Sequence, residues 1–188
     1  ENRMQRLARA LCATLALSAS TLAAASVVTN VYSGFGGGDG TPFSGLVGTL
    51  TTPGISFGTD TGFDWHPFGL GAFGSQSLGS LVVGVEADYS FDLTSDDGSS
   101  LYIDGALVID NGGGHSPDTK SGVAHLTPGE HSFVVNFFED FGGASGLDLA
   151  LPSGVRFAEA VPEPATYALV LVALGAGAVA RRRVKTAA

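Results

Sequence analysis

The stretch LVVGVEADYSFDL, residues 81–93, decides the fold class of this chain. It places an apolar residue at every second position from Leu81 to Leu93, with mostly polar or small residues between them. Successive side chains of a β-strand point to opposite faces, so a period of two indicates a half-buried strand. The stretch therefore predicts either one long strand or two strands separated by a break.

Other strand and turn patterns follow at short intervals. They lie at 101–104 and 106–110 on either side of Asp104-Gly105, at the turn 127–129, and in the strands 131–138 and 147–151. Asp-Gly is suited to a tight hairpin, and Thr127-Pro128-Gly129 to a turn. No window between 26 and 160 has a convincing helical period. The pattern predicts an all-β domain, an antiparallel sandwich or barrel.

Residues 26–80 combine many glycines with many aromatic residues. They hold 14 of the 28 glycines, but also six phenylalanines and Trp65. Flexible glycine-rich linkers are poor in aromatic residues, so this composition favours ordered loops and edge strands over disorder. Val27 to Tyr32 is the expected first strand.

Charge is unevenly distributed along the 188 residues. Between 26 and 160 there are 16 acidic residues and only two basic ones, Lys120 and Arg156, for a net charge of about −14. Nucleic-acid binding needs clustered lysine and arginine, so that function class is excluded. An acidic surface suits divalent cations or neutral partners.

The first 25 residues have the pattern of a signal peptide. Arg3, Arg6 and Arg9 precede an apolar stretch, and Ala23 and Ala25 form an A-x-A cleavage site. A membrane-spanning helix is the alternative, but the apolar stretch is shorter than the ~20 residues that a bilayer needs. We expect a cleaved N-terminal signal peptide at 1–25.

The C-terminal segment 161–188 predicts a second sorting signal. Pro162, Glu163 and Pro164 precede an apolar run at 165–180, which in turn precedes Arg181-Arg182-Arg183. This order resembles the PEP-CTERM signal of Gram-negative bacteria. The resemblance implies a single short transmembrane helix at 165–180, transient residence in the inner membrane and processing by an exosortase. It also implies delivery to the cell surface or extracellular matrix. A plain C-terminal anchor is the alternative.

Apparent enzyme motifs lack the context that they need. Gly69, Gly71 and Gly74 match G-x-G-x-x-G, but no strand precedes the match and no helical pattern follows it, so a glycine-rich loop is predicted. The four histidines lack the helical spacing of a metalloprotease, although His125 and His131 could face each other across a hairpin. No G-x-S-x-G elbow is present, and no carboxylate pair is singled out as catalytic. We expect no enzyme activity.

The motif richest in chemical information is the acidic turn after residue 93. The sequence runs Tyr89-Ser-Phe91, then Asp96-Asp97-Gly98, then Leu101-Tyr-Ile-Asp-Gly105. It resembles the fourteen-kilodalton protective-antigen domain family, most strongly over 81–151 of a 26–160 domain. The resemblance implies a lectin-like, adhesin-type antiparallel β-sandwich.

In the adhesin branch of that family, a paired Asp-Asp with a cis peptide bond binds calcium, which helps to hold a sugar. The resemblance places these metal ligands at Asp96 and Asp97. Calcium takes six to eight oxygen ligands, and adjacent carboxylates supply some of them. Additional ligands are expected from Asp110, Asn111, Glu139 and Asp140. The alternative is a turn without metal, since Asp-Asp-Gly also favours a turn by itself.

Three functions fit these patterns. The first is an exported surface or matrix module that binds carbohydrate, such as exopolysaccharide, with calcium as a possible cofactor. The second is a structural or adhesive matrix protein without sugar specificity, and a hydrolase is a distant third. Trp65, Phe68 and Phe73 could form a sugar-stacking platform in the glycine-rich loops, or could instead cap the core.

Overall fold

The computed structural model describes residues 26–159, which form eleven β-strands and two short 3-10 turns. Within this range no helix is long and apolar enough to cross a membrane. The predicted signal peptide at 1–25, with Ala23 and Ala25, lies outside the described residues. So does the predicted sorting segment with its helix at 165–180.

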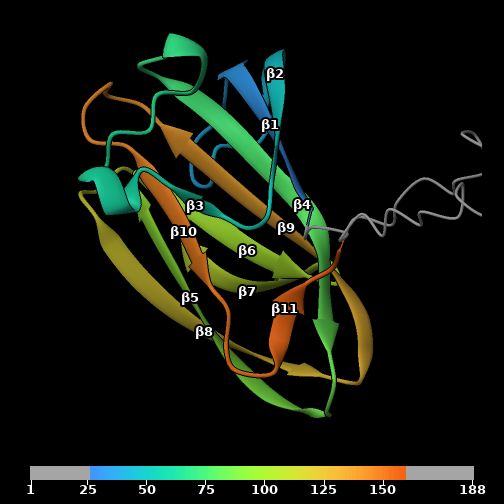
Figure 1. Ribbon diagram of the computed structural model, residues 1–188. Coiled ribbons are helices and arrows are strands. Elements are labelled where there is room, and N and C mark those ends of the chain that lie inside the picture. The colour runs from blue at the N-terminus through green and yellow to red at the C-terminus, as the bar shows by residue number, and fades with distance from the viewer. Residues whose placement is uncertain (1–25, 160–188) are drawn as a thin grey trace, which may run out of the picture. The chain divides into compact units, whose positions relative to one another are not determined.

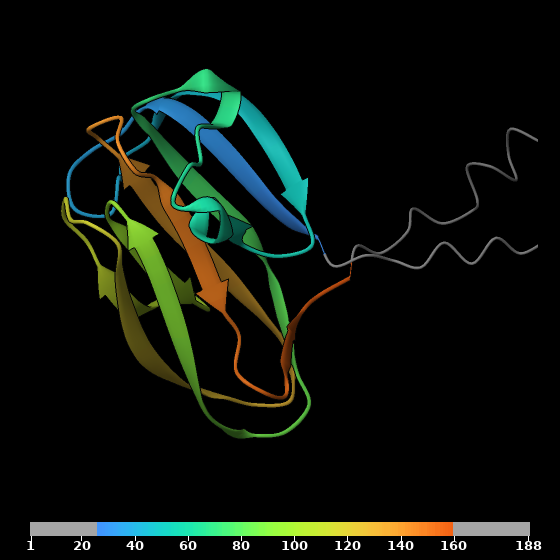
Figure 2. The same ribbon diagram turned by 60° about the vertical axis from the view of Figure 1, so that its left-hand side comes forward.

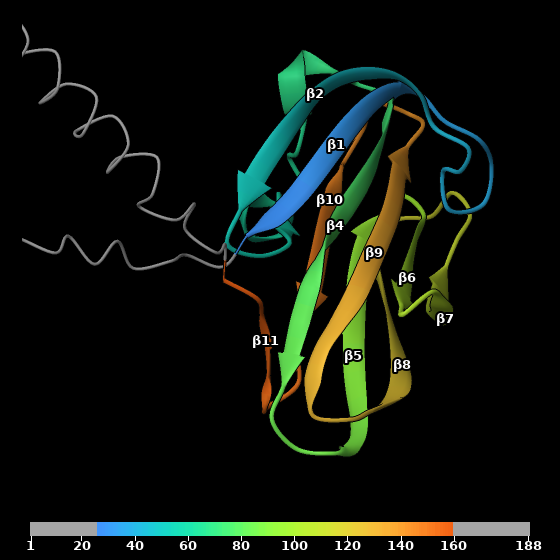
Figure 3. The ribbon, with the colours of Figure 1, turned by 90° about the vertical axis from the view of Figure 1, so that its right-hand side faces the viewer.

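Two antiparallel sheets face each other (Figure 1). The larger, seven-stranded sheet contains, in spatial order, β2 (Ser44–Thr52), β1 (Val27–Gly34), β4 (Phe73–Val83), β9 (Gly129–Glu139), β6 (Ser99–Ile103) and β7 (Ala106–Asn111), with β11 (Val155–Phe157) also paired to β4. The smaller sheet contains β3 (Ser56–Phe57), β10 (Gly146–Ala150), β5 (Ala87–Asp96) and β8 (Asp118–Leu126). Figure 3 shows β5 and β8 lying behind β4 and β9. The predicted all-β antiparallel sandwich is confirmed.

The alternating stretch 81–93 is two strands, one in each sheet. Leu81 is fully buried at the end of β4, and Phe91 is fully buried in β5. Val85 lies in the connection between them and is 68% exposed. The alternation continues across the turn because both strands turn one face toward the same core.

The hairpin at Asp104-Gly105 is also confirmed, since it joins β6 to β7. Both residues have positive φ angles, 48° for Asp104 and 79° for Gly105. Aspartate and glycine are among the residues that tolerate this conformation best, so the dipeptide suits the tight connection.

The prediction for residues 26–80 was right for β1 but wrong for β4. β4 lies in the interior of the larger sheet and pairs with β9 along its whole length, from Phe73 opposite Glu139 to Val83 opposite Gly129. The glycines of β4 weaken its strand pattern in the sequence, but in the fold they leave room for aromatic rings. A Cβ on Gly79 would lie 2.8 Å from the Phe133 ring.

The expected proximity of His125 and His131 is wrong. The turn at 127–129 links β8 and β9, which belong to different sheets, so the two histidines do not lie across a hairpin. His125 Nδ1 lies 2.8 Å from Asp88 on β5, and His131 Nδ1 lies 2.6 Å from Asp104. Each histidine pairs with a carboxylate instead of with the other.

The loop between β3 and β4 closes one end of the core. It carries the 3-10 turns η1 (Thr59–Thr61) and η2 (Pro67–Gly69), which are visible in Figure 2. Trp65 is 9% exposed and stacks on Phe57, with ring centroids 4.3 Å apart. Phe73 is fully buried and Phe68 is 53% exposed. The sugar-platform hypothesis is therefore wrong for Trp65 and Phe73, which belong to the core.

Candidate metal centre

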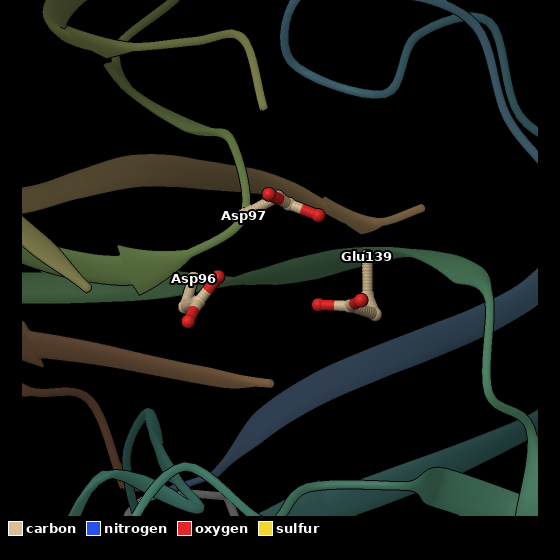
Figure 4. A group of neighbouring side chains, drawn as sticks. All are labelled: Asp96, Asp97 and Glu139. Carbon is tan, nitrogen blue, oxygen red and sulfur yellow. The ribbon is translucent and has the colours of Figure 1, made fainter. Parts of the chain in front are cut away.

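Three carboxylates converge at one end of the sandwich, where β5 leads into β6 and where β9 ends. Asp96, Asp97 and Glu139 each offer an oxygen within 4.8 Å of the others, and they are 7%, 4% and 1% exposed. Figure 4 shows their carboxyl groups gathered around one space, with that of Glu139 pointing toward Asp96. The peptide bond between Asp96 and Asp97 is cis, as the family resemblance implies.

Strand pairing brings these distant residues together. Ser99, at the start of β6, pairs with Phe137 of β9, and the N–H of Phe138 donates a 3.0 Å hydrogen bond to the Gly98 carbonyl. The Asp96–Gly98 turn and the end of β9 are thus neighbours. Sheet register, and not closeness in sequence, therefore places Glu139 beside the aspartates.

Asp97 also organises the surrounding loops. Its Oδ1 accepts a 2.9 Å hydrogen bond from the backbone N–H of His115, and its Oδ2 accepts one of 3.1 Å from the N–H of Asp140. A charged acceptor makes these bonds stronger than bonds between neutral groups. Asp97 therefore ties two loops to the turn that carries it.

Glu139 uses one oxygen for its own loop and leaves the other free. Its Oε1 accepts hydrogen bonds from the backbone N–H groups of Phe141 at 3.0 Å and Gly142 at 2.8 Å. Its Oε2 is buried and has no hydrogen-bond partner within the described residues. A buried, unpaired carboxylate oxygen is costly when it is ionised, and either a proton or a cation would remove that cost.

Burial and mutual repulsion act on the same carboxylates. Burial raises the pKa of Asp96, and the charge of Asp97 raises it further. Burial and the charge of Asp97 likewise raise the pKa of Glu139, against the lowering effect of hydrogen bonds from the backbone N–H groups of Gly143, Phe141 and Gly142. Ionising all three groups together is therefore unfavourable unless a cation is present.

No lysine or arginine of the described domain offsets this charge, and the charge of His115 lowers the pKa of Asp96 by less than burial and Asp97 raise it. The domain's one lysine and one arginine form ion pairs elsewhere: Lys120 lies 2.8 Å from Asp118, and Arg156 lies 4.0 Å from Glu159. The His115 ring is also engaged, because its two nitrogens lie 2.8 Å from the Ser116 carbonyl and 3.0 Å from the Asn111 carbonyl. The cluster therefore presents only oxygen donors.

The carboxylates line a pocket of about 400 Å³, which we call the carboxylate pocket. Its walls are Asp96, Asp97, Gly114, His115, Ser116, Glu139, Phe141, Gly143 and Ala144. The volume lies within the ~300–1,000 Å³ typical of small-ligand sites. The carboxylates can thus meet an ion and a ligand from solvent at the same time.

The predicted additional ligands have different positions. Of the four, only Glu139 joins the carboxylate cluster. Asp110 is exposed and its Oδ1 accepts a hydrogen bond from the N–H of Gly112. Asn111 is buried and its side chain donates to Ser95 Oγ at 3.0 Å. Asp140 contributes its backbone N–H to Asp97 and is one of the residues that line a neighbouring pocket.

Phe141 was missed in the sequence, although it is the most exposed large apolar residue of the domain, at 80%. It lines the carboxylate pocket, where no aromatic residue was expected. Its signal was an aromatic residue set between Asp140 and Gly142, directly after a predicted ligand pair. The G-x-G-x-x-G match does not form the strand, loop and helix of a dinucleotide site. Gly74 lies in β4, and no helix follows it within the described residues.

Comparisons with solved structures place the fold among sandwich domains. The chain is similar to an anti-sigma factor domain-containing protein (19% identity, TM-score 0.56), with 72% of this chain and 48% of that chain covered. It thus spans about half the length of that protein. At these identities the likeness concerns the fold.

Two further structures are matched over most of their length. One is the PA14 domain of the MpAFP antifreeze protein (18% identity, TM-score 0.55), with coverage of 70% of this chain and 84% of that chain. The other is a PA14 sugar-binding domain from an RTX adhesin (20% identity, TM-score 0.53), with coverage of 71% and 90%. No curated protein matches the chain in sequence.

Family models account for most of the sequence. The model of the PEP-CTERM protein-sorting motif matches residues 160–184, which include Pro162, Glu163 and Pro164. The model of the PA14 domain, a name related to that of the protective-antigen domain, matches residues 37–156. This match extends beyond the 81–151 of the resemblance and covers more than half of the chain. The chain therefore belongs to the PA14 domain family, and its domain is followed by a PEP-CTERM sorting motif.

Proposed function

We propose that this exported, surface-associated protein binds neutral carbohydrate through a calcium ion held by Asp96, Asp97 and Glu139. The single observation that carries the proposal is the buried Oε2 of Glu139, which has no partner within the described domain and belongs to a carboxylate clustered with those of Asp96 and Asp97. The sugar-binding PA14 domain of the RTX adhesin supports the ligand class.

The donor set fits calcium better than the soft or borderline metals. Calcium prefers six to eight oxygen ligands, whereas zinc is more often bound by cysteine and histidine. Three carboxylates supply part of that number and leave positions for water, carbonyl or hydroxyl oxygens. Three negative charges against the two positive charges of calcium leave a net −1, which favours neutral sugar hydroxyls over anionic ligands.

The sorting motif supplies the cellular context of the proposal. A PEP-CTERM motif at 160–184 implies processing by an exosortase, and hence a domain that meets extracellular polymers. Exopolysaccharide of the producing cell is the proposed partner, at the cell surface or in the extracellular matrix.

An array of neutral and acidic glycans, probed with the full chain in calcium and again in chelator, tests the proposal. We expect binding to neutral glycans in calcium, loss of that binding in chelator, and loss of binding in Glu139→Gln. Binding that is equally strong in chelator would contradict the role of the metal. An absence of binding to every glycan would contradict the carbohydrate function.

A second candidate is an adhesive module without sugar specificity. The edge strand β2 favours it, because Leu46 is 60% exposed and Val47 is 44% exposed on that strand. Exposed edge strands can pair with other chains. Retention of the protein in matrix stripped of polysaccharide, but not on glycan arrays, would support this second function.

A further inference from the structure

A second pocket adjoins the carboxylate pocket. It has a volume of about 490 Å³, and we call it the glycine pocket. Its lining is Phe35, Gly36, Gly37, Gly38, Gly113, Gly114, Phe138, Asp140 and Phe141. Gly114 and Phe141 line both pockets, so the two hollows meet along these two residues.

Phe141 is placed to contact a ligand on either side of this boundary. Its ring is 80% exposed, while its backbone N–H is held 3.0 Å from Glu139 Oε1. The carboxylate cluster thus anchors the backbone of an aromatic residue that the protein does not bury. An exposed ring of this kind offers a flat apolar face to the apolar face of a sugar.

Gly114 keeps the passage between the pockets open. A Cβ at this position would lie 3.3 Å from the Phe141 ring and 3.6 Å from Asp97 Oδ1. Any longer side chain would therefore enter the space between the aromatic ring and the carboxylate. Glycine in such a position permits close approach of a ligand.

The backbone conformation at Gly37 does not require glycine. Its φ is not positive, and a Cβ there would meet nothing within 4 Å. By contrast, Gly38 and Gly113 have φ angles of 75° and 90°, which disfavour other residues. Since the fold accepts a side chain at Gly37, the space in front of it is free for a ligand.

The wall that carries Gly37 is held in place by half-buried polar contacts. Asp39 Oδ2 accepts hydrogen bonds from Ser100 Oγ at 2.8 Å and Asn136 Nδ2 at 3.1 Å. The N–H of Gly113 donates a 2.8 Å bond to the Gly38 carbonyl, which joins the two glycine-rich loops. A wall fixed before binding loses little entropy when a ligand is bound.

We infer that the two pockets form one groove for an oligosaccharide of neutral sugars, with one unit in the carboxylate pocket and the next in the glycine pocket. Phe141 contacts the ligand where the two units join. The inference rests on the proposed calcium-dependent sugar binding and extends it from a single sugar to a chain. The lining of the glycine pocket contains Asp140 and no basic residue, which disfavours anionic sugars there.

Titration calorimetry of the full chain in calcium tests the inference. The probes are the methyl glycosides of glucose, galactose, mannose and fucose, and the linear tetrasaccharides of the sugars that bind. We expect a tetrasaccharide to bind at least tenfold more tightly than its monosaccharide. Gly37→Leu should remove this gain, while monosaccharide affinity and the calcium response stay unchanged.

Gly84→Leu is the matched control. Gly84 is exposed, has no positive φ, has nothing within 4 Å of an added Cβ and lines neither pocket, so the tetrasaccharide gain should persist. Equal affinities of wild type for monosaccharide and tetrasaccharide would overturn the inference and leave the proposed function intact. A gain that survives in folded Gly37→Leu would also overturn it. If no probe binds, the proposed function fails and the inference fails with it.

Discussion

The backbone N–H of Asp140 donates a 3.1 Å hydrogen bond to Oδ2 of Asp97, 43 residues earlier in the chain. Because Oδ1 of Asp97 accepts from His115, both oxygens of this side chain hold loops that surround the pocket. An asparagine at 97 would turn its NH₂ group toward one of these N–H groups. Loss of metal binding in Asp97→Asn would therefore be mixed with a local structural change.

Asp96→Asn and Glu139→Gln separate the two effects. Asp96 has no side-chain hydrogen bond within the described domain, and glutamine at 139 keeps an oxygen where Oε1 accepts its backbone bonds. A hundredfold excess of calcium over its Kd should stabilise wild type by about 2.7 kcal/mol. The corresponding rise in Tm is on the order of 10 °C. Both variants should lose most of this rise.

Without calcium, Glu139→Gln should be at least as stable as wild type, because a buried, repelled carboxylate has been removed. Thermal unfolding followed by circular dichroism, in calcium and in chelator, measures both effects. Asp60→Asn is the control, since Asp60 is an exposed carboxylate in η1. A wild-type Tm unaffected by chelator would mean that the acidic turn holds no calcium.

Stability should fall as the pH rises above about 6.5, through the deprotonation of His131. Its two ring nitrogens face Asp104 Oδ2 at 2.6 Å and the Thr127 carbonyl at 2.8 Å, and these two acceptors raise the pKa of His131. A group with a raised pKa in the folded state contributes full stability below its unfolded pKa of about 6.5. That contribution disappears as the pH rises through the folded pKa.

Urea unfolding between pH 5 and 9 measures this slope. His131→Gln should flatten it, and so should Asp104→Asn, in which asparagine tolerates the positive φ of residue 104. His125→Gln is the control. The pKa of His125 is also raised, by Asp88 and Glu86, but its side chain is 60% exposed, so this substitution should change the slope less than His131→Gln does. An unchanged slope in His131→Gln would refute the assignment.

Trp65→Ala should be among the most destabilising substitutions in the loop between β3 and β4. The indole stacks on Phe57 at 4.3 Å and meets Phe73 edge-on at 5.1 Å, and its removal leaves a cavity that costs about 3–5 kcal/mol. Phe68→Ala should cost less than about 2 kcal/mol, because Phe68 is already 53% exposed. Chemical denaturation of both variants makes the comparison, and similar losses would contradict the core role of Trp65.

The sorting motif predicts a processed product. In the native host, the surface protein should lack the first 25 residues and should end near residues 160–166. Replacement of Pro162, Glu163 and Pro164 by alanine should leave the tail attached. Mass spectrometry of secreted material measures both ends, and recovery of intact Arg181-Arg182-Arg183 from the cell surface would favour a plain anchor.

Local patterns in the sequence were enough for the fold class and for two of the three residues of the carboxylate cluster. The alternation across 81–93, the Asp104-Gly105 hairpin and the adjacent Asp96 and Asp97 depend on residues close together in the chain, so their spacing carries the information. β4 escaped because its glycines and serines serve packing by neighbouring rings, as at Gly79 beside Phe133. No short window of sequence records such a contact.

Only the tertiary structure chose among the candidate ligands. Asp110 and Glu139 are both acidic residues near strand ends, yet Asp110 is exposed and lies outside the cluster, while the register of β6 on β9 brings Glu139 to Asp96. Long-range contacts also bring Phe141 and the loop of Gly37 to the lining of one pocket, the glycine pocket. Sequence determined which chemical groups this protein carries and the strands that hold them. Strand register decided which groups meet, because pairing joins residues separated by tens of positions in the chain.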